Sequence, residues 1–184
     1  MEERNWTGRV FIGMSVDGFI ARLDDDIEWL TSRGEQAGDT GFESFMATID
    51  HLVMGRGTYD KVLETGFWPY DGKRILVLSS RLETDDRRVQ VVRSLDGARA
   101  VLDASAQGVY IDGGQVVRAF MREGLVDEIT LTRVPVLIGE GKPLFGALAR
   151  DVDLRLLDNR TLGGGLVQVR YKVLPLDTSV PVAA

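Results

Sequence analysis

The chain has 184 residues and a formal net charge of −6, with 22 lysines and arginines against 28 aspartates and glutamates. Its acidic balance argues against sequence-independent nucleic-acid binding, which requires a basic face. One histidine and no cysteine exclude disulfides, thiol nucleophiles and multi-histidine or cysteine metal sites, so we expect no metal centre. This length predicts one domain, residues 1–184, with a core at about 9–173 and a tail from 174. No apolar run reaches the ~20 residues of a membrane span and the start is polar, so we expect a cytoplasmic protein.

Short apolar runs alternate with helical stripes along the chain. Val10–Ser15 predicts a strand, and the acidic, glycine-rich residues 22–41 that follow predict a long mobile loop. Residues 153–160 and 166–173, around three glycines, predict an antiparallel hairpin. Strands alternating with helices predict an α/β protein with a mostly parallel, helix-covered central sheet. The other strands are expected at 51–54, 74–78, 89–92, 109–111 and 128–134, and the helices at 42–49, 58–63, 95–106 and 116–121.

Three predicted strands end in residues suited to an anion. Residues 54–58 pass through glycines into a helix and carry Arg56, a bidentate phosphate donor. Residues 78–81 offer two hydroxyls and an arginine, and residues 112–115 offer two glycines before a helix. Each junction alone is also typical of an ordinary turn. Together, at one edge of one sheet, they favour a dinucleotide or phosphate ligand.

The same segments resemble a known group of enzymes. LVMGRGTYDKVL (52–63), GKRILVLSSRLETDD (72–86), VYIDGG (109–114) and EITLTRV (128–134) are similar to segments of dihydrofolate reductase. MSVDGFIA (14–21) and residues 124–145 resemble its relative, the reductase domain of riboflavin biosynthesis. The resemblance covers about residues 9–173 in order. It implies a three-layer dihydrofolate reductase-like fold with a C-terminal antiparallel hairpin, and NADPH as the cofactor.

The resemblance also implies which residues would contact NADPH. The adenosine phosphates would lie at the first junction, the 2′-phosphate after the 74–78 strand, the pyrophosphate at the third junction and the nicotinamide after the first strand. Arginines and hydroxyls at one edge suit a 2′-phosphate better than a bare ribose diol, which agrees with this assignment. The residues at the adenosine phosphates would be Gly55, Arg56 and Thr58, and those at the 2′-phosphate Ser79, Ser80 and Arg81. The residues at the pyrophosphate would be Gly113, Gly114, Gln115 and Val116, and those at the nicotinamide Gly13, Asp17, Gly18 and Ile20.

Two acidic residues are candidates for the proton donor. Asp39 falls near the spacing of the helical acid of dihydrofolate reductases, and Thr132 falls where those enzymes have a threonine bonded to that acid. A solvated loop acid and an ordinary strand threonine are the alternatives. We expect the proton to come from Asp39, Asp17 or bound water, in that order.

Aromatic residues near the same site have two interpretations each. Trp29 is either a lid over the nicotinamide or a buried anchor of its loop. Phe42 and Phe45 are either core residues or the apolar wall of a site for a flat heterocycle.

These observations predict an NADPH-dependent reductase of a flat pyrimidine- or pteridine-type heterocycle. Its nearest counterpart would be 5-amino-6-(5-phosphoribosylamino)uracil reductase, although residues 42–46 lack the histidine and arginine that the riboflavin enzymes carry there. Dihydrofolate reductase activity, a non-catalytic NADPH-binding protein and an acidic scaffold are the alternatives. Because the hairpin offers an edge strand that needs covering, we also expect a homodimer.

Overall fold

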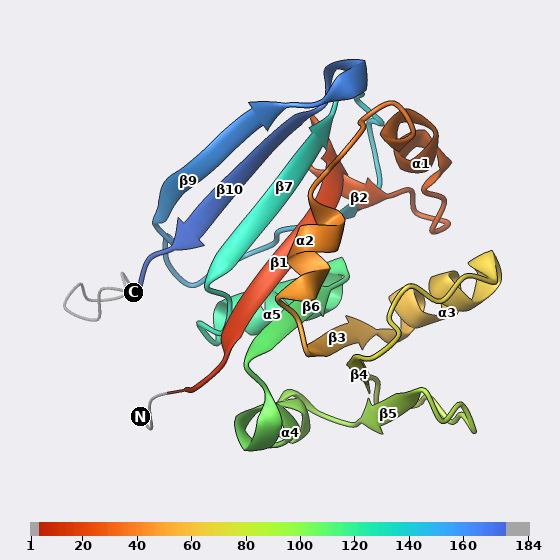
Figure 1. Cartoon of the computed structure of the whole chain (residues 1–184), viewed down its shortest axis with the longest axis vertical. Helices are drawn as coiled ribbons and strands as arrows, with labels where there is room; N and C mark the ends of the chain where they lie inside the picture. Colours follow the sequence, from red (N-terminus) through yellow and green to blue (C-terminus); the bar gives the residue numbers. More distant parts are fainter. Residues whose placement is uncertain (1–3, 176–184) are drawn as a thin grey trace.

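A central sheet of eight strands organises the computed structural model, which describes residues 4–175 (Figure 1). Its strand order is β5-β4-β3-β6-β1-β7-β10-β9. The pairings from β5 to β7 are parallel, while β10 runs antiparallel to both β7 and β9. The strands are β1 (Thr7–Ser15), β3 (His51–Gly55), β4 (Arg74–Leu78), β5 (Val89–Val92), β6 (Gly108–Asp112), β7 (Glu128–Val134), β9 (Leu154–Thr161) and β10 (Val167–Val173).

Helices cover both faces of this sheet and make three layers. α2 (Phe42–Ala47) and α3 (Arg56–Thr65) lie on one face, and α4 (Leu95–Ser105) and α5 (Gly114–Arg122) on the other (Figure 1). Ser94 caps α4 as its sequence predicts, since its hydroxyl accepts a hydrogen bond from the Gly97 amide. None of the helices among residues 4–175 is long and apolar enough to cross a membrane.

Two apolar cores lie between these layers. Along β3, Leu52 and Met54 face α2 and α3, while Val53 faces α4 and α5. A strand buried on both faces needs a continuous apolar run, which is why the central strands lack the alternation of half-exposed ones. Full burial of each such side chain contributes about 1.5–3 kcal/mol relative to exposure. Phe120 of α5, which is fully buried, anchors the other helical layer in the same way.

A second, two-stranded sheet lies beside the carboxyl end of β1. It pairs β2 (Phe19–Ala21) with β8 (Lys142–Pro143). These strands are too short to show a period of two, so the sequence did not reveal them.

The predicted α/β class, the mostly parallel sheet and the C-terminal hairpin are confirmed. The prediction of an unbroken loop over residues 22–41 is wrong, because α1 (Glu28–Gly34) lies within it. α1 is held by tertiary contacts, since Trp29 packs in a small cluster with Val134 and Leu166. Of the predicted tail, residues 176–184 lie outside the described residues.

Candidate active site

The carboxyl ends of the parallel strands β3 and β6 form the point where the strand order in the sheet changes direction. β3 continues through α3 to β4 on one side, whereas β6 continues through α5 to β7 on the other side. The two helices lie on opposite faces of the sheet. This arrangement opens a crevice between neighbouring strands, the usual ligand site of open α/β sheets. β4 and β1 flank it, so the four predicted segments of the cofactor site come to one edge.

Two helix N-termini meet at this crevice. Gly55 precedes α3 and Gly113 precedes α5, and within the described part of the chain no side chain caps either helix. The first amides of both helices are therefore free to bind an anion, and the helix dipoles favour negative charge there. The predicted Gln115 and Val116 lie in the first turn of α5. Because the Val116 side chain is buried in the core, it can offer a ligand only its backbone.

Glycine is required at position 113. Its φ is +83°, and a Cβ there would lie 2.5 Å from the Thr58 hydroxyl oxygen. The two junctions thus touch each other at the centre of the crevice, where a side chain at position 113 would collide with Thr58.

The loop after β4 adds the third predicted segment. The Ser79 hydroxyl oxygen accepts hydrogen bonds from the Leu82 amide at 3.1 Å and the Arg81 amide at 3.4 Å. Arg93, which the sequence analysis did not single out, donates to the carbonyl oxygens of Ser79 and Leu82 at 3.2 and 2.7 Å. These bonds fix the loop and leave Ser80 and Arg81 exposed at its surface.

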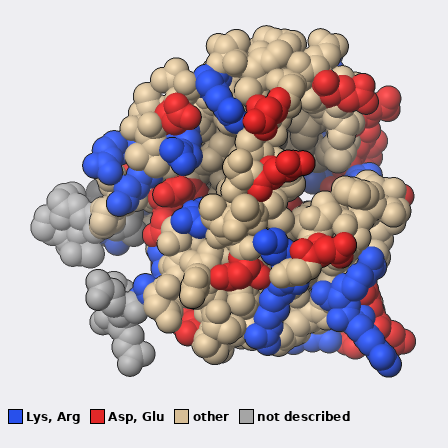
Figure 2. Space-filling view, viewed as in Figure 1, with Lys and Arg blue, Asp and Glu red and all other residues tan. Residues whose placement is uncertain are grey.

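Basic and acidic side chains lie together near β5 and the loop before it, at the lower right of Figure 2. Two of these arginines are paired, Arg88 with Asp86 and Arg93 with Glu83. Arg56 also faces solvent, where its Nε donates to the Asp60 carboxylate at 3.1 Å. An exposed pair of this kind contributes little stability, so its guanidinium can turn to a phosphate at small cost.

The segments predicted for the nicotinamide end lie beside α5. A Cβ on Gly114 would lie 3.0 Å from Ile20 of β2, so these two predicted residues are neighbours. Gly13 is similarly close to α1, because a Cβ there would lie 2.6 Å from the Leu30 side chain. Gly18 has a φ of +92°, which allows the tight turn between β1 and β2.

Asp17 fastens this turn to the loop before β8. Its carboxylate accepts the Gly139 amide at 2.8 Å and the Ile138 amide at 3.2 Å. Hydrogen bonding, chiefly with Ser15 and then with these two amides, lowers the Asp17 pKa below its ordinary value. The group is therefore ionised at neutral pH and acts as a hydrogen-bond acceptor.

Aromatic rings line the face of the sheet under α2. Phe11 of β1 lies 5.4 Å from Phe42 and 4.9 Å from Phe45, measured between ring centroids. Tyr110 of β6 meets Phe45 edge to face at 5.1 Å. Phe42 and Phe45 of α2 are only partly buried. Their rings pack against the core, and part of the surface of each ring remains accessible.

Asp39 and Thr132 do not bond to each other. The Asp39 carboxylate accepts the Gly41 amide at 2.7 Å, and the Thr132 hydroxyl oxygen accepts Gln168 Nε2 at 2.9 Å. Asp39 lies on the rim of a cavity of about 490 Å³ between α2 and the strands β7, β10 and β9. Gln168 links Thr132 of β7 to the Thr40 carbonyl, because its Nε2 donates to both. A glutamine in a predicted strand does not by itself indicate such a link.

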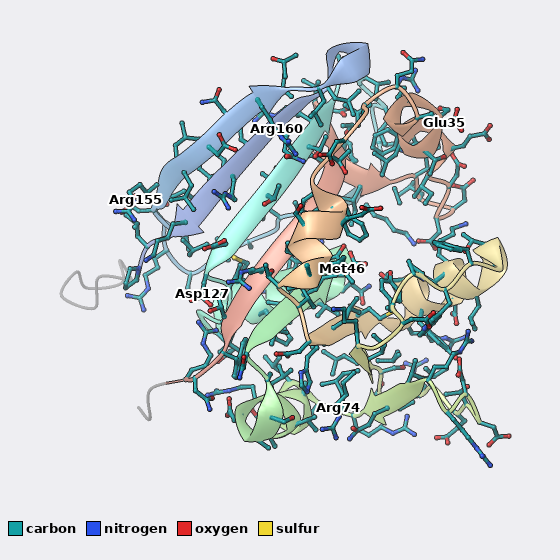
Figure 3. The ribbon with its side chains drawn as sticks, in the orientation of Figure 1. Glu35, Met46, Arg74, Asp127, Arg155 and Arg160 are labelled. Atoms are coloured by element: carbon teal, nitrogen blue, oxygen red, sulfur yellow. The ribbon has the colours of Figure 1, made fainter. Side chains whose placement is uncertain are left out.

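Gln168 and Arg160 form a polar latch over the segment that leads into α2. Gln168 Nε2 donates to the Thr40 carbonyl at 3.1 Å, and Arg160 Nη2 donates to the same oxygen at 2.5 Å. Arg160 Nε also donates to Gln168 Oε1 at 2.9 Å. Arg160 extends from the hairpin toward this segment (Figure 3). The C-terminal hairpin therefore positions α2, which lies more than a hundred residues earlier in the chain.

Trp29 is buried at 5% exposure in the cluster that holds α1. Among residues 4–175, its indole Nε1 is the buried side-chain polar atom that lacks a hydrogen-bond partner. Its packing matches the interpretation of Trp29 as an anchor of its loop.

Asp112 is a half-buried acid that none of the predicted roles uses. It ends β6 beside Met54, and its carboxylate accepts the Gly113 amide at 2.8 Å. Burial raises its pKa to about 6, against the smaller opposing effects of the Gly113 amide and Tyr110. Burial also raises the pKa of Tyr110 and of Tyr70, and the Asp112 charge adds to both shifts.

Comparison with known proteins identifies the group to which this site belongs. The family described as the RibD C-terminal domain matches residues 71–168. The YwjB protein of Bacillus subtilis strain 168, which is uncharacterised, is 34% identical over 88% of this chain and 95% of its own. The chain belongs to the RibD C-terminal domain family. YyaP of the same organism, also uncharacterised, is 26% identical over 87% of this chain and 91% of its own.

Solved structures agree with this family and with the fold. A Shewanella sp. PV-4 protein, provisionally named a riboflavin biosynthesis protein, has a TM-score of 0.84 and 36% identity, covering 92% of this chain and 99% of its own. RibD of Acinetobacter baumannii has a TM-score of 0.67 at 19% identity, covering 92% of this chain and 58% of its own. Dihydrofolate reductase of Schistosoma mansoni has a TM-score of 0.66 at 19% identity, over 92% of this chain and all of its own. The predicted dihydrofolate reductase-like fold is confirmed.

Proposed function

We propose that this RibD C-terminal domain protein is an NADPH-dependent reductase of a flat pyrimidine- or pteridine-type heterocycle. Family membership supports a reductase of the riboflavin pathway type. The observation that carries the finer proposal is the pair of uncapped helix N-termini at the reversal point of the sheet, with an arginine-bearing loop beside them. We further propose that the whole chain forms one domain around this crevice.

The residues at the crevice fit a dinucleotide phosphate. Backbone amides at Gly114 and Gln115 would hold the pyrophosphate, and Thr58 with Arg56 would face the adenosine side. Ser79, Ser80 and Arg81 would surround the 2′-phosphate, with their loop fixed by Arg93. The close approach of Gly113 to Thr58, which brings the two helix N-termini together, supports this fit. NADPH would supply the hydride, and the protein would orient the reacting partners and exclude water.

The substrate would lie on the aromatic face beneath α2. Phe42 and Phe45 would form one wall of its site, and Gly13, Gly18 and Ile20 would border the nicotinamide. Such a wall favours the binding of flat, uncharged rings. An aromatic pair with its ring centroids about 4.5–7 Å apart contributes about 0.5–1.5 kcal/mol beyond the burial of its surface. We assign Asp17 to clasping the β1–β2 turn and Trp29 to anchoring α1. Asp39 would lie at the outer rim, and buried Thr132 would support it through Gln168.

Binding and turnover measurements test this proposal directly. We expect NADPH to quench tryptophan fluorescence and raise the melting temperature, and NADH to bind at least tenfold more weakly. Arg81→Ala should remove most of that preference, whereas Arg99→Ala, on an exposed position of α4, should leave it intact. Absence of NADPH binding would refute the proposal.

Candidate substrates then separate the alternatives. Oxidation of NADPH with 5-amino-6-(5-phosphoribosylamino)uracil would place the protein in the riboflavin reaction, and oxidation with 7,8-dihydrofolate would make it a dihydrofolate reductase. Tight NADPH binding without oxidation by either compound would favour a non-catalytic binding protein.

We also propose that the protein forms a homodimer through its hairpin. β9 is an edge strand with almost all of its residues exposed, and Leu154 and Leu156 are 42% and 51% exposed. An edge of this kind is usually covered. Light scattering should therefore give twice the chain mass at micromolar concentration, and Leu156→Asp should give the monomer mass. A monomeric native protein would refute the dimer.

A further inference from the structure

We propose that Ser105, His51 and Asp50 form a nucleophilic triad at the amino-terminal edge of the sheet, and that small activated esters acylate its serine. This site lies at the amino end of β3, whereas the candidate cofactor crevice lies at its carboxyl end. The inference therefore does not depend on the proposed reductase function. The placement of the three side chains, the hydrogen bonds that join them and a neighbouring arginine support it.

The fold brings the three side chains together from separate elements. Asp50 directly precedes β3, His51 is the first residue of that strand, and Ser105 is the last residue of α4. His51 is buried at 5% exposure, while Ser105 is exposed. A reagent can thus reach the serine from solvent, whereas the imidazole beside it is held in place by packing.

The hydrogen bonds of Asp50 fix the tautomer of the imidazole. Its Oδ1 lies 2.5 Å from His51 Nδ1. The same carboxylate accepts two backbone amides, from Gln107 at 2.9 Å and from Gly108 at 3.2 Å. Burial raises the pKa of Asp50, but the hydrogen bonds from His51 and the two amides outweigh burial and lower this pKa below its ordinary value. An ionised carboxylate only accepts hydrogen bonds, so Nδ1 carries the ring proton and Nε2 keeps a free lone pair.

The nitrogen with the lone pair faces the serine hydroxyl. His51 Nε2 lies 3.1 Å from Ser105 Oγ, closer than the Val101 carbonyl oxygen of the same helix at 3.3 Å. Because Nε2 is an acceptor, the Ser105 hydroxyl donates to it. Nucleophile, base and orienting carboxylate are therefore joined in series, the arrangement that activates serine in enzymes of unrelated fold.

Arg74 adds a positive charge beside the hydroxyl. It pairs with His51 in the register of β3 and β4, and its Nη1 donates to Ser105 Oγ at 3.4 Å. Its Nη2 donates to Gln90 Oε1 at 3.1 Å, which holds the side chain between α4 and β5 (Figure 3). A guanidinium at this place can stabilise the oxyanion that forms when the serine attacks an ester carbonyl. Because Arg74 and Ser105 are both exposed, the site suits small esters with a good leaving group.

The acylation step balances without a cofactor. Ser105 Oγ bonds to the acyl carbon, its proton passes to His51 Nε2, and the C–O bond to the leaving group breaks. The leaving oxygen takes the proton from Nε2 and departs as an alcohol or phenol. Water then attacks the acyl-serine with His51 as the base, which releases the carboxylic acid and restores the serine hydroxyl.

Acylation of the native chain tests the nucleophile directly. p-Nitrophenyl acetate should release p-nitrophenol in a burst of about one equivalent per chain. Peptide mass spectrometry should locate the acetyl group on Ser105, and Ser105→Ala should lose the burst while its circular dichroism spectrum stays unchanged. Ser32→Ala is the matched control, because Ser32 is also exposed and donates to a helical carbonyl, that of Glu28, at 2.6 Å. The control should keep the full burst. Absence of acetyl-Ser105, or equal acetylation of Ser32, would overturn the inference.

The single histidine of the chain allows a second test of the mechanism. Asp50→Asn keeps an oxygen for the two backbone amides but turns an N–H toward His51 Nδ1, so the ring proton should move to Nε2. ¹⁵N NMR of the imidazole should show the Nδ1–H tautomer in the wild type and the Nε2–H tautomer in the variant. Acylation of Ser105 should slow by about 10²–10⁴-fold, as loss of a general base does. Asp96→Asn, at an exposed position of α4, should change neither property. An Nε2–H tautomer in the wild type, or wild-type acylation in Asp50→Asn, would refute the triad.

Discussion

Replacing Asp112 by asparagine should stabilise the protein at alkaline pH. The structure raises the pKa of this acid from an ordinary 3.8 to about 6. The difference of about 2.2 units, at about 1.36 kcal/mol per unit, corresponds to an upper limit of about 3 kcal/mol in the free energy of unfolding. Because the folded pKa is raised, this contribution is fully present below pH 4 and is lost as pH rises through about 6. Asparagine cannot ionise and avoids the loss.

Urea unfolding of the wild type and of Asp112→Asn at pH 4 and pH 8 measures this effect. We expect similar stabilities at pH 4 and a variant more stable by up to about 3 kcal/mol at pH 8. In a chain of this size, that corresponds to a rise in melting temperature of up to about 10 °C. Asp96→Asn controls for charge removal and should show no such dependence on pH. A variant that is less stable than the wild type at pH 8, or a difference that is the same at both pH values, would refute the reasoning.

Three further predictions concern the frame of the site. Gln168→Leu leaves the buried Thr132 hydroxyl without its donor and leaves Arg160 as the side-chain donor to the Thr40 carbonyl. It should therefore lower the free energy of unfolding by about 1–3 kcal/mol in urea titrations and raise KM more than it lowers kcat; an unchanged KM would contradict the positioning role. Gly113→Ala should weaken NADPH binding at least tenfold by fluorescence titration, whereas Gly124→Ala, which also has a positive φ but open space around it, should cost stability alone. Asp17→Asn should lower the protection against hydrogen exchange of the two amides that its carboxylate binds, and in the wild type the protection factor of these amides should fall as pH drops below the lowered Asp17 pKa; equal protection in both proteins at neutral pH would contradict the clasp.

Local patterns were sufficient for most of the sheet. The predicted bounds of Arg74–Leu78, Val89–Val92 and Glu128–Val134 match the structure residue for residue. These runs are either continuously apolar or regularly alternating, so burial alone marks where they begin and end. Glycines and polar residues at the strand ends likewise indicated the edge at which the helix N-termini gather.

Contacts between distant segments account for what the sequence missed. α1 is stabilised by burial of Trp29 against Val134 and Leu166, residues more than a hundred positions away. The latch from Gln168 to Thr40 likewise joins the last strand to the segment before α2. No local period records such contacts, because each partner looks ordinary in its own segment.

The sequence by itself determined the layers, the parallel sheet and the chemistry available at its edge, because periodicity and residue type are local properties. The tertiary structure alone decided which acid is shielded from solvent. Asp112 and Asp17 both follow apolar strands, yet one carboxyl group is enclosed by tyrosines and the other accepts backbone amides from another loop. Burial raises one pKa and hydrogen bonding lowers the other. The protonation state of an acid depends on its surroundings in space, and only the folded chain assembles them.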